Sequence, residues 1–133
     1  MAIKPQKIDL SESDGDIATD ADLVVRRLKS DGLYKPNLMY RGFNGEELKI
    51  MLEHGTDTPD SDMIYCSNEN ELREGGNMSA LRYAYYHSNP ALAVYDSSKL
   101  IDSKESYQRK RFIDSQQKLD ALIAVYLLPE AEL

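Results

Sequence analysis

The sequence has a single cysteine, Cys66, among its 133 residues. One cysteine cannot form an intramolecular disulfide and offers no set of zinc ligands. No run of about 18 apolar residues occurs, so the sequence predicts no membrane span. Lys4 and Lys7 are not followed by an apolar segment, and a cleaved secretory signal is therefore not expected. We expect a cytoplasmic protein, with secretion by a route that needs no cleaved signal as the alternative.

The sequence also has fewer basic than acidic residues. The chain has 16 lysines and arginines against 23 aspartates and glutamates, which gives a formal net charge of -7 at pH 7. This charge repels polyanions, so nucleic acid is not an expected partner. The length fits one domain with one hydrophobic core. Residues 1–16 are polar and acidic and are expected to form a flexible acidic arm, with residues 17–133 as the single folded domain.

Several motifs of known sites are missing. No Gly-x-Gly-x-x-Gly and no Gly-x-x-x-x-Gly-Lys-Ser/Thr occurs, so neither a Rossmann nor a P-loop nucleotide site is expected. No Gly-x-Ser-x-Gly marks a serine nucleophile. The aspartates of residues 57–62 lack the glycine and the glutamate of an EF-hand loop, and His54 and His87 lack the spacing of a metal pair. The sequence therefore predicts no metal site.

What the sequence does contain is an arginine, Arg41, inside the apolar segment from Leu38 to Phe43. Burying a guanidinium without an anionic partner costs several kcal/mol, so Arg41 needs an explanation. Its partner can be a carboxylate of the protein, for example Glu46 or Glu47, or a phosphate of a ligand. The residues alone leave both possibilities open.

Helical and strand-like patterns alternate along the chain. Apolar spacing and capping residues predict helices over residues 19–31, 45–54 and 79–86. Short apolar runs predict strands over residues 38–43, 63–66, 91–95 and 121–128, the last one central in its sheet. Residues 69–76 read as a loop or a single helical turn. This order indicates an α+β fold, with a parallel α/β sheet as the alternative.

Residues 97–120 are locally basic, which sets them apart from the rest of the chain. The cations of this region are interleaved with Tyr107 and Phe112. A solvated face and an anion-binding edge are both compatible with this pattern. The cations that make the region locally basic include Lys104, Arg109, Lys110, Arg111 and Lys118.

These landmarks together resemble the ADP-ribosyltransferase family, in the branch defined by an arginine, a serine motif and a late glutamate. The resemblance covers roughly residues 38–96, and Tyr40-Arg41-Gly42 is its most specific step. The rest of the resemblance depends on the order and spacing of the matching segments. The matching segments are Tyr40-Arg41-Gly42, Glu47-Leu48-x-x-Met51-Leu52-x-x-Gly55, Tyr65-Cys66-Ser67-Asn68, Ala80-Leu81-x-Tyr83-Ala84 and Ala91-Leu92-Ala93-Val94-Tyr95.

The resemblance implies a split antiparallel sheet with flanking helices and with NAD, the substrate, held in the cleft between its halves. It further implies that Arg41 contacts the phosphate or ribose of NAD and that Ser67 supports the nicotinamide pocket. Gly42 and Tyr83 are expected beside the cofactor as well. The implied activity is that of a mono-ADP-ribosyltransferase, which transfers ADP-ribose from NAD to a protein or another nucleophile without a metal ion.

The third motif of that family departs from its pattern here. No Glu-x-Glu or Gln-x-Glu precedes the last apolar run, where the sequence reads Gln116-Gln117-Lys118-Leu119-Asp120. Asp120 is the acidic residue nearest the expected position and is our candidate for the catalytic acid, with Asp114 as a weaker substitute. The alternatives are a non-catalytic relative that acts as a protein-interaction module, and an unrelated α+β protein in which Arg41 forms a structural ion pair.

Overall fold

The structure is a computed structural model that describes residues 6–8, 17–43, 53, 63–74, 79–85, 90–102, 109–111 and 120–128. Helices and two sheets occur together, so the α+β expectation is confirmed. The elements are, in chain order, β1 (Gln6–Lys7), α1 (Ile17–Ser30), β2 (Leu38–Phe43), β3 (Met63–Tyr65), α3 (Glu69–Glu74), α4 (Ala80–Ala84), β4 (Ala91–Asp96), the 3-10 helix η1 (Ser97–Lys99), β5 (Ile101–Asp102), β6 (Arg109–Arg111) and β7 (Leu122–Leu127).

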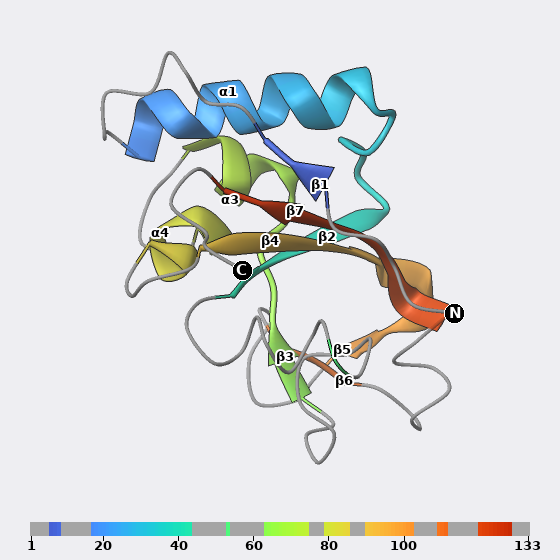
Figure 1. Cartoon of the computed structure of the whole chain (residues 1–133). Helices are drawn as coiled ribbons and strands as arrows, with labels where there is room; N and C mark the ends of the chain where they lie inside the picture. The colour runs from blue at the N-terminus through green and yellow to red at the C-terminus, as the bar shows by residue number, and fades with distance from the viewer. Residues whose placement is uncertain are drawn as a thin grey trace.

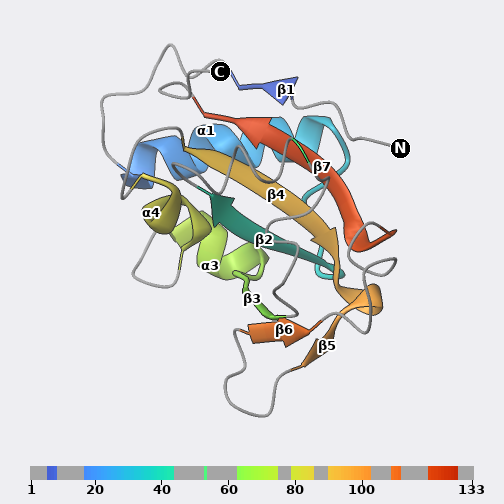
Figure 2. The ribbon, with the colours of Figure 1, turned by 60° about the horizontal axis from the view of Figure 1, so that its bottom comes forward.

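The larger sheet has the strand order β1-β7-β4-β2 (Figure 2). Strand β4 pairs antiparallel with β2 on one side and with β7 on the other. Apolar β7 is therefore an internal strand, as predicted. Strand β1 runs parallel to β7, so this sheet is mixed and not purely antiparallel. A register shift between Val94 and Tyr95 leaves Ile123 of β7 as an extra residue, 38% exposed.

The smaller sheet has the order β3-β6-β5, with antiparallel pairing throughout. It meets the larger sheet at one isolated bridge between Tyr40 of β2 and Ser67, two residues after β3. The amide of each residue donates to the carbonyl of the other, at 2.9 and 2.7 Å. The fold is thus built on two sheets that touch at the middle of β2.

The larger sheet has two apolar faces, each with its own core. On the helix face, α1 and α4 cover side chains such as Tyr40, Leu92 and Tyr126. The opposite face, which we call the inter-sheet face, is lined by Met39, Ala91, Ala93, Tyr95, Leu122, Val125 and Leu127, joined by Cys66, Leu100 and Ala121. Figure 1 shows α1 above the larger sheet and β3, β5 and β6 below it. The inter-sheet face is therefore the one turned toward the smaller sheet.

Helix α4 lies unusually close to β2 at Gly42. A methyl group added to Gly42 would overlap the Ala80 carbonyl oxygen and would lie 3.0 Å from the Ala84 amide nitrogen. Ser79 starts this helix, because its hydroxyl accepts a hydrogen bond from the Leu81 amide at 3.2 Å. The backbone of α4 thus occupies the place that a side chain at Gly42 would need.

Residues 69–74 form a six-residue helix, α3, where we expected a loop or a single turn. A capping box explains its formation. The Asn68 side chain accepts from the Glu71 amide at 2.8 Å, and the Glu71 carboxylate accepts from the Asn68 amide at 2.9 Å. Fully buried Leu72 then anchors the short helix to the core of the helix face.

Residues 6–8, within the segment expected to be a flexible arm, pair with the larger sheet. Gln6 and Lys7 pair with Tyr126 and Leu127 of β7, and the Ile8 amide donates to the Leu127 carbonyl at 2.9 Å. Ile8 is 2% exposed and belongs to the core of the helix face. One buried isoleucine and the backbone pairing hold these residues on the domain despite their polar neighbours.

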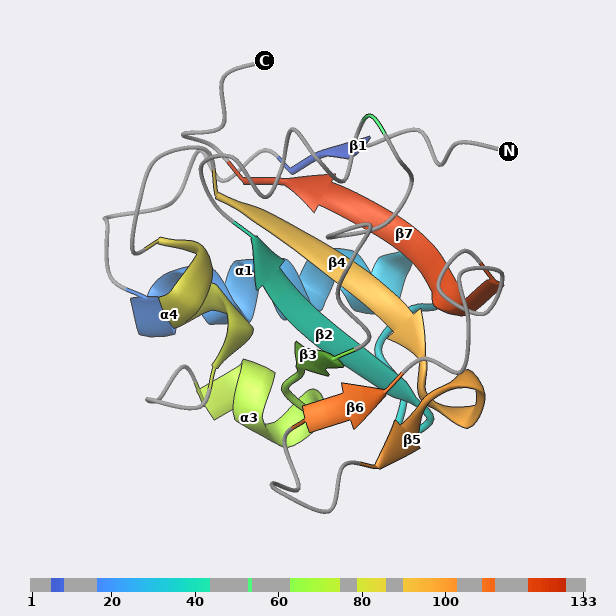
Figure 3. The same cartoon turned by 90° about the horizontal axis from the view of Figure 1, so that it is seen from below.

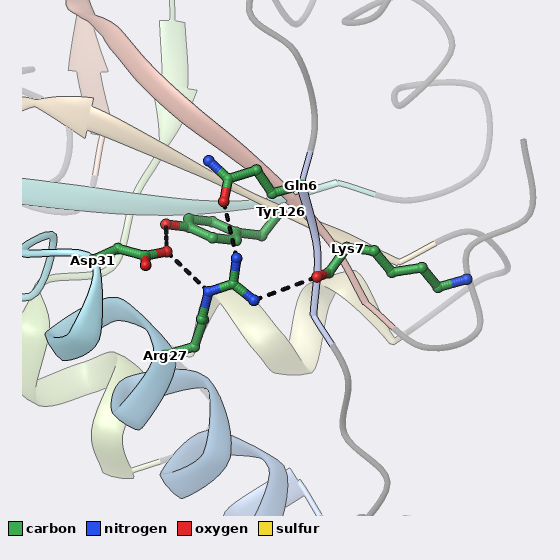
Figure 4. A network of polar contacts seen from close by, with 5 residues as sticks. All are labelled: Gln6, Lys7, Arg27, Asp31 and Tyr126. Carbon is green, nitrogen blue, oxygen red and sulfur yellow. Dashed lines mark hydrogen bonds and ion pairs between the residues drawn. The ribbon is translucent and has the colours of Figure 1, made fainter.

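Arg27 of α1 fastens this strand to the domain (Figure 4). Its guanidinium donates to the Gln6 side-chain oxygen at 2.9 Å and to the Lys7 carbonyl at 3.4 Å. It also binds the Asp31 carboxylate at 2.9 Å and lies 5.6 Å from the centroid of the Tyr126 ring. The Tyr126 hydroxyl donates to the same carboxylate oxygen of Asp31 at 2.6 Å. The network joins β1, the C-terminal end of α1 and β7.

This network predicts an acid-sensitive contribution to stability. Hydrogen bonds from Tyr126 and then Arg27 lower the pKa of Asp31 below its ordinary value of 3.8. A depressed carboxyl pKa stabilises the fold above the unfolded-state pKa, and this stabilisation is lost as the pH falls through the lower folded-state pKa. We expect Tyr126→Phe to lower the free energy of unfolding by about 1 kcal/mol near pH 7. The difference from wild type should shrink below about pH 4.

Denaturant unfolding at a series of pH values from 3 to 7 measures this difference. Tyr34→Phe is the matched control. The Tyr34 hydroxyl donates at 2.6 Å to a backbone carbonyl oxygen, that of residue 69, and a backbone carbonyl does not titrate. The deficit of Tyr34→Phe should stay constant over the same range. A Tyr126→Phe deficit that does not change with pH would show that Asp31 is not linked to Tyr126.

The other predicted elements have mixed outcomes. Helix 19–31 and strands 38–43, 63–66 and 91–95 are confirmed, with small shifts at their ends. The helix after Ser79 is confirmed as α4. The predicted helix over residues 45–54 lies outside the described residues except for Glu53.

Candidate functional site

Arg41 lies within β2, the edge strand of the larger sheet beside β4, and on the inter-sheet face. Side chains alternate along β2, with Met39 in the core of the inter-sheet face and Tyr40 in the core of the helix face. Arg41 therefore shares the face of Met39. Its direct cross-strand neighbour is Ala93, which pairs onward with Val125. Arg41 is 9% exposed, so its side chain is largely buried beside the bridge that joins the two sheets.

Ser67 is brought next to Arg41 in the backbone, but on the other face. Residues that face each other in an antiparallel pair share a face, so Ser67 lies on the side of Tyr40. Its neighbour Cys66 belongs to the core of the inter-sheet face. Cys66, and not Ser67, therefore shares the face of Arg41. The face on which Ser67 lies depends on which residue of β2 it pairs with, and the sequence alone does not show this pairing.

Gly42 and Tyr83 are turned toward, or lie on, the helix face of the larger sheet, which is opposite to the face of the Arg41 side chain. The side of Gly42 that lacks a side chain is occupied by the backbone of α4, as described above. The residues through which α4 packs on the helix face are Ala80, Leu81 and Ala84, and Tyr83 on the same helix is 51% exposed. Neither residue is thereby placed on the face of Arg41.

Asp120 lies two residues before β7, which begins at Leu122. The two residues that follow it, Ala121 and Leu122, belong to the core of the inter-sheet face. Asp120 itself is exposed, and its carbonyl oxygen accepts from the Lys99 side chain at 3.3 Å. Leu122 pairs with Tyr95, two rows along the sheet from Ala93.

The described residues thus give a site with two ends. Arg41 supplies a buried cation on the inter-sheet face, and Asp120 is an exposed acidic residue just before β7. Of the β4 residues on this face, Ala93 is opposite Arg41, and Tyr95, which pairs with Leu122, lies on the side toward Asp120. Chemically, the arginine can bind a phosphate by paired hydrogen bonds, and the carboxylate can stabilise a developing positive charge.

Other candidates named from the sequence fall outside this arrangement. Asp114, Glu46 and Glu47 lie outside the described residues. Within the described part of the chain, no group of three His, Cys, Asp or Glu residues is placed to hold a metal ion. No helix of that same part is long and apolar enough to cross a membrane.

Comparison with known proteins leaves the family of the chain undetermined. No family model matches the sequence, and neither a curated protein nor a solved structure is significantly similar to it.

Proposed function

We propose that this domain binds NAD on the inter-sheet face, in the manner of ADP-ribosyltransferases, and transfers ADP-ribose to a protein or another nucleophile. The observation that carries the proposal is the buried Arg41 at the junction of the two sheets. An arginine held there by the central part of β2 is fixed in position, and its planar fork suits the diphosphate of a dinucleotide. A cytoplasmic location would give such a domain ready access to NAD.

Asp120 fits the second requirement of the reaction. Cleavage of the bond between ribose and nicotinamide builds positive charge on the ribose, and a nearby carboxylate stabilises that charge. NAD is an extended molecule, so its diphosphate and its nicotinamide ribose need separate protein groups. Arg41 on β2 and Asp120 just before β7 lie at separated positions, which is compatible with this need. Asp120 is one carbon shorter than the glutamate used in the family.

Binding of NAD by calorimetry tests the first half of the proposal. We expect Arg41→Ala to weaken binding by about 10- to 100-fold, the usual effect of losing hydrogen bonds to a charged group. Arg41→Lys should recover only part of this loss, because lysine keeps the charge without the fork. Arg73→Ala, which removes an exposed arginine of α3, is the control and should bind like wild type. A folded wild type that does not bind NAD would reject the proposal.

Release of nicotinamide tests the second half. Asp120→Asn keeps the shape of the side chain and removes its charge. We expect this variant to bind NAD and to lose most of the NAD hydrolysis shown by wild type, because removing one electrostatic stabiliser of a transition state commonly costs about 100-fold or more in rate. If wild type binds NAD but hydrolyses none and modifies no acceptor, the domain is the non-catalytic relative, and a protein-interaction role becomes the leading alternative.

A further inference from the structure

Strand β1 is held at the edge of the larger sheet by residues that lie far from it in the sequence. Figure 3 shows β1 beyond β7, on the side away from β2. The strand pairs with the last two residues of β7, and Arg27 reaches it from α1. In the sequence, residues 9–16 connect it to α1, which begins at Ile17. The contacts of β1 are thus tertiary contacts, which the same residues can make with an identical strand of another molecule.

Three residues bind the strand, and we call them the β7 edge site: Arg27, Tyr126 and Leu127. The Leu127 carbonyl accepts a hydrogen bond from the Ile8 amide at 2.9 Å. Arg27 donates to the Gln6 side-chain oxygen at 2.9 Å and to the Lys7 carbonyl at 3.4 Å. Tyr126 is the register partner of Gln6. The site therefore contacts both the backbone and one polar side chain of the strand.

Arg27 is also positioned by contacts that do not involve β1. The Asp31 carboxylate binds its guanidinium at 2.9 Å, and the Tyr126 ring lies 5.6 Å away and holds the same carboxylate through its hydroxyl (Figure 4). These contacts join α1 and β7, so they persist when β1 leaves. Because Asp31 already offsets the charge of Arg27, an uncharged acceptor such as the Gln6 amide suits the site better than a second carboxylate.

The β1 segment defines what an occupant of the site needs. Gln6 supplies an uncharged side-chain acceptor, Lys7 is exposed, and Ile8 is 2% exposed in the core of the helix face. A second copy of this chain carries the same three residues in the same order. Its strand would repeat each contact that β1 makes, so the exchange costs mainly the freedom lost on association.

We propose that the β7 edge site binds β1 of a second copy of this chain, so that two molecules exchange this strand in a symmetric dimer. The exchange is reciprocal, because each molecule offers one strand and one site. Only a short ladder and one buried isoleucine have to open, which is a local opening of the fold. The proposal is independent of NAD, since Arg41 lies on the opposite face of the sheet from Ile8.

A disulfide between residues 7 and 127 of different molecules tests the exchange. Lys7 and Leu127 are register partners on neighbouring strands, a separation at which a disulfide can form. Lys7→Cys and Leu127→Cys are made as separate variants, mixed, unfolded, refolded together at high protein concentration and oxidised. The control mixes Leu127→Cys with Ser30→Cys, which places a cysteine at an exposed position of α1. The 7–127 product should exceed the control product at least about tenfold, because adjacent cysteines have a high effective concentration.

Sedimentation velocity of wild type refolded in the same way is a second test, which needs no added cysteine. The dimer fraction should rise with the protein concentration during refolding. Ile8→Asp should stay monomeric, because a charged side chain cannot enter the core of the helix face. Lys7→Gln is the matched control on the same strand and should dimerise like wild type, since Lys7 is exposed. Thermal unfolding establishes that each variant is folded.

Three results would overturn the proposal. The first is a 7–127 product no more abundant than that of the Ser30→Cys control. The second is a dimer that Ile8→Asp also forms, because its interface would then lie elsewhere. The third is a wild type that stays monomeric at every concentration, and binding of a free peptide of residues 3–10 would in that case assign the β7 edge site to an extended peptide of another protein.

Discussion

Gly42→Ala should destabilise the protein by at least about 3 kcal/mol, at the upper end of the range for overpacking substitutions. The added methyl group would overlap the carbonyl oxygen of Ala80, which belongs to the backbone of α4 and cannot move by a change of rotamer. Either α4 has to shift away from β2 or the strand has to bend. Urea unfolding monitored by circular dichroism measures the loss directly.

Gly32→Ala is the control for this prediction. Gly32 follows α1 with a positive φ of 72°, and a methyl group there would meet nothing within 4 Å. Its substitution should therefore cost only the backbone strain of a left-handed residue, about 1 to 2 kcal/mol. A Gly42→Ala variant that is no less stable than Gly32→Ala would show that α4 does not press on β2.

Leu92→Ala is expected to cost about 2 to 5 kcal/mol, the range for truncating a fully buried leucine. Leu92 has no exposed surface and pairs with Gly42 on one side and with Tyr126 on the other. Gly42 carries no side chain, and the Tyr126 ring is held by its hydrogen bond to Asp31. These neighbours cannot easily close the cavity, so we expect a value in the upper half of the range.

Ile123→Ala removes a similar amount of apolar side chain from the same sheet and is the matched control. Ile123 is the extra residue in β7 and is 38% exposed, so its truncation should cost about 0.5 kcal/mol. Both variants can be compared by the denaturant concentration at the midpoint of unfolding, with equal slopes expected. Similar midpoints for the two variants would contradict the central position given to Leu92.

Local patterns in the sequence were enough for the elements that depend on local chemistry. The apolar spacing of α1 and the run of β7 both predicted the observed element, because α1 keeps the helical period over several turns and β7 is a continuous apolar run. Helix α3 was missed although its capping box, Asn68 with Glu71, was present in the sequence. The spacing of Asn68 and Glu71 is the local signal for this helix.

Pairing between strands that are distant in the chain could not be predicted from the sequence. Strand β1 has only two polar residues, and nothing local marks Gln6 and Lys7 as a strand. Strand β6 carries no apolar alternation at all, so its place in a sheet depends on its neighbours β3 and β5. Tertiary context decides such short strands, because strand propensity reflects packing against partners.

The candidate site was likewise predictable in its local chemistry and not in its strand pairing. Arg41 was singled out because an arginine in an apolar strand is chemically unusual, and the structure does bury it. The face on which Ser67 lies depends on the register of one bridge, and a shift of one residue would have placed it beside Arg41. The residue types in the sequence therefore identified Arg41 as a candidate, whereas strand register determined which side chains lie beside it.

The pairing of β1 with β7 also constrains how the chain can fold during synthesis. Gln6 and Tyr126 are register partners at opposite ends of the described chain, so β1 has no strand to join until β7 has left the ribosome. Closing so long a loop is slow compared with forming a local hairpin. Until then Ile8 has no completed core to enter, and the nascent chain presents it to solvent or to a chaperone. Ribosome-stalled chains that stop before β7 should accordingly be far more sensitive to protease than the released protein.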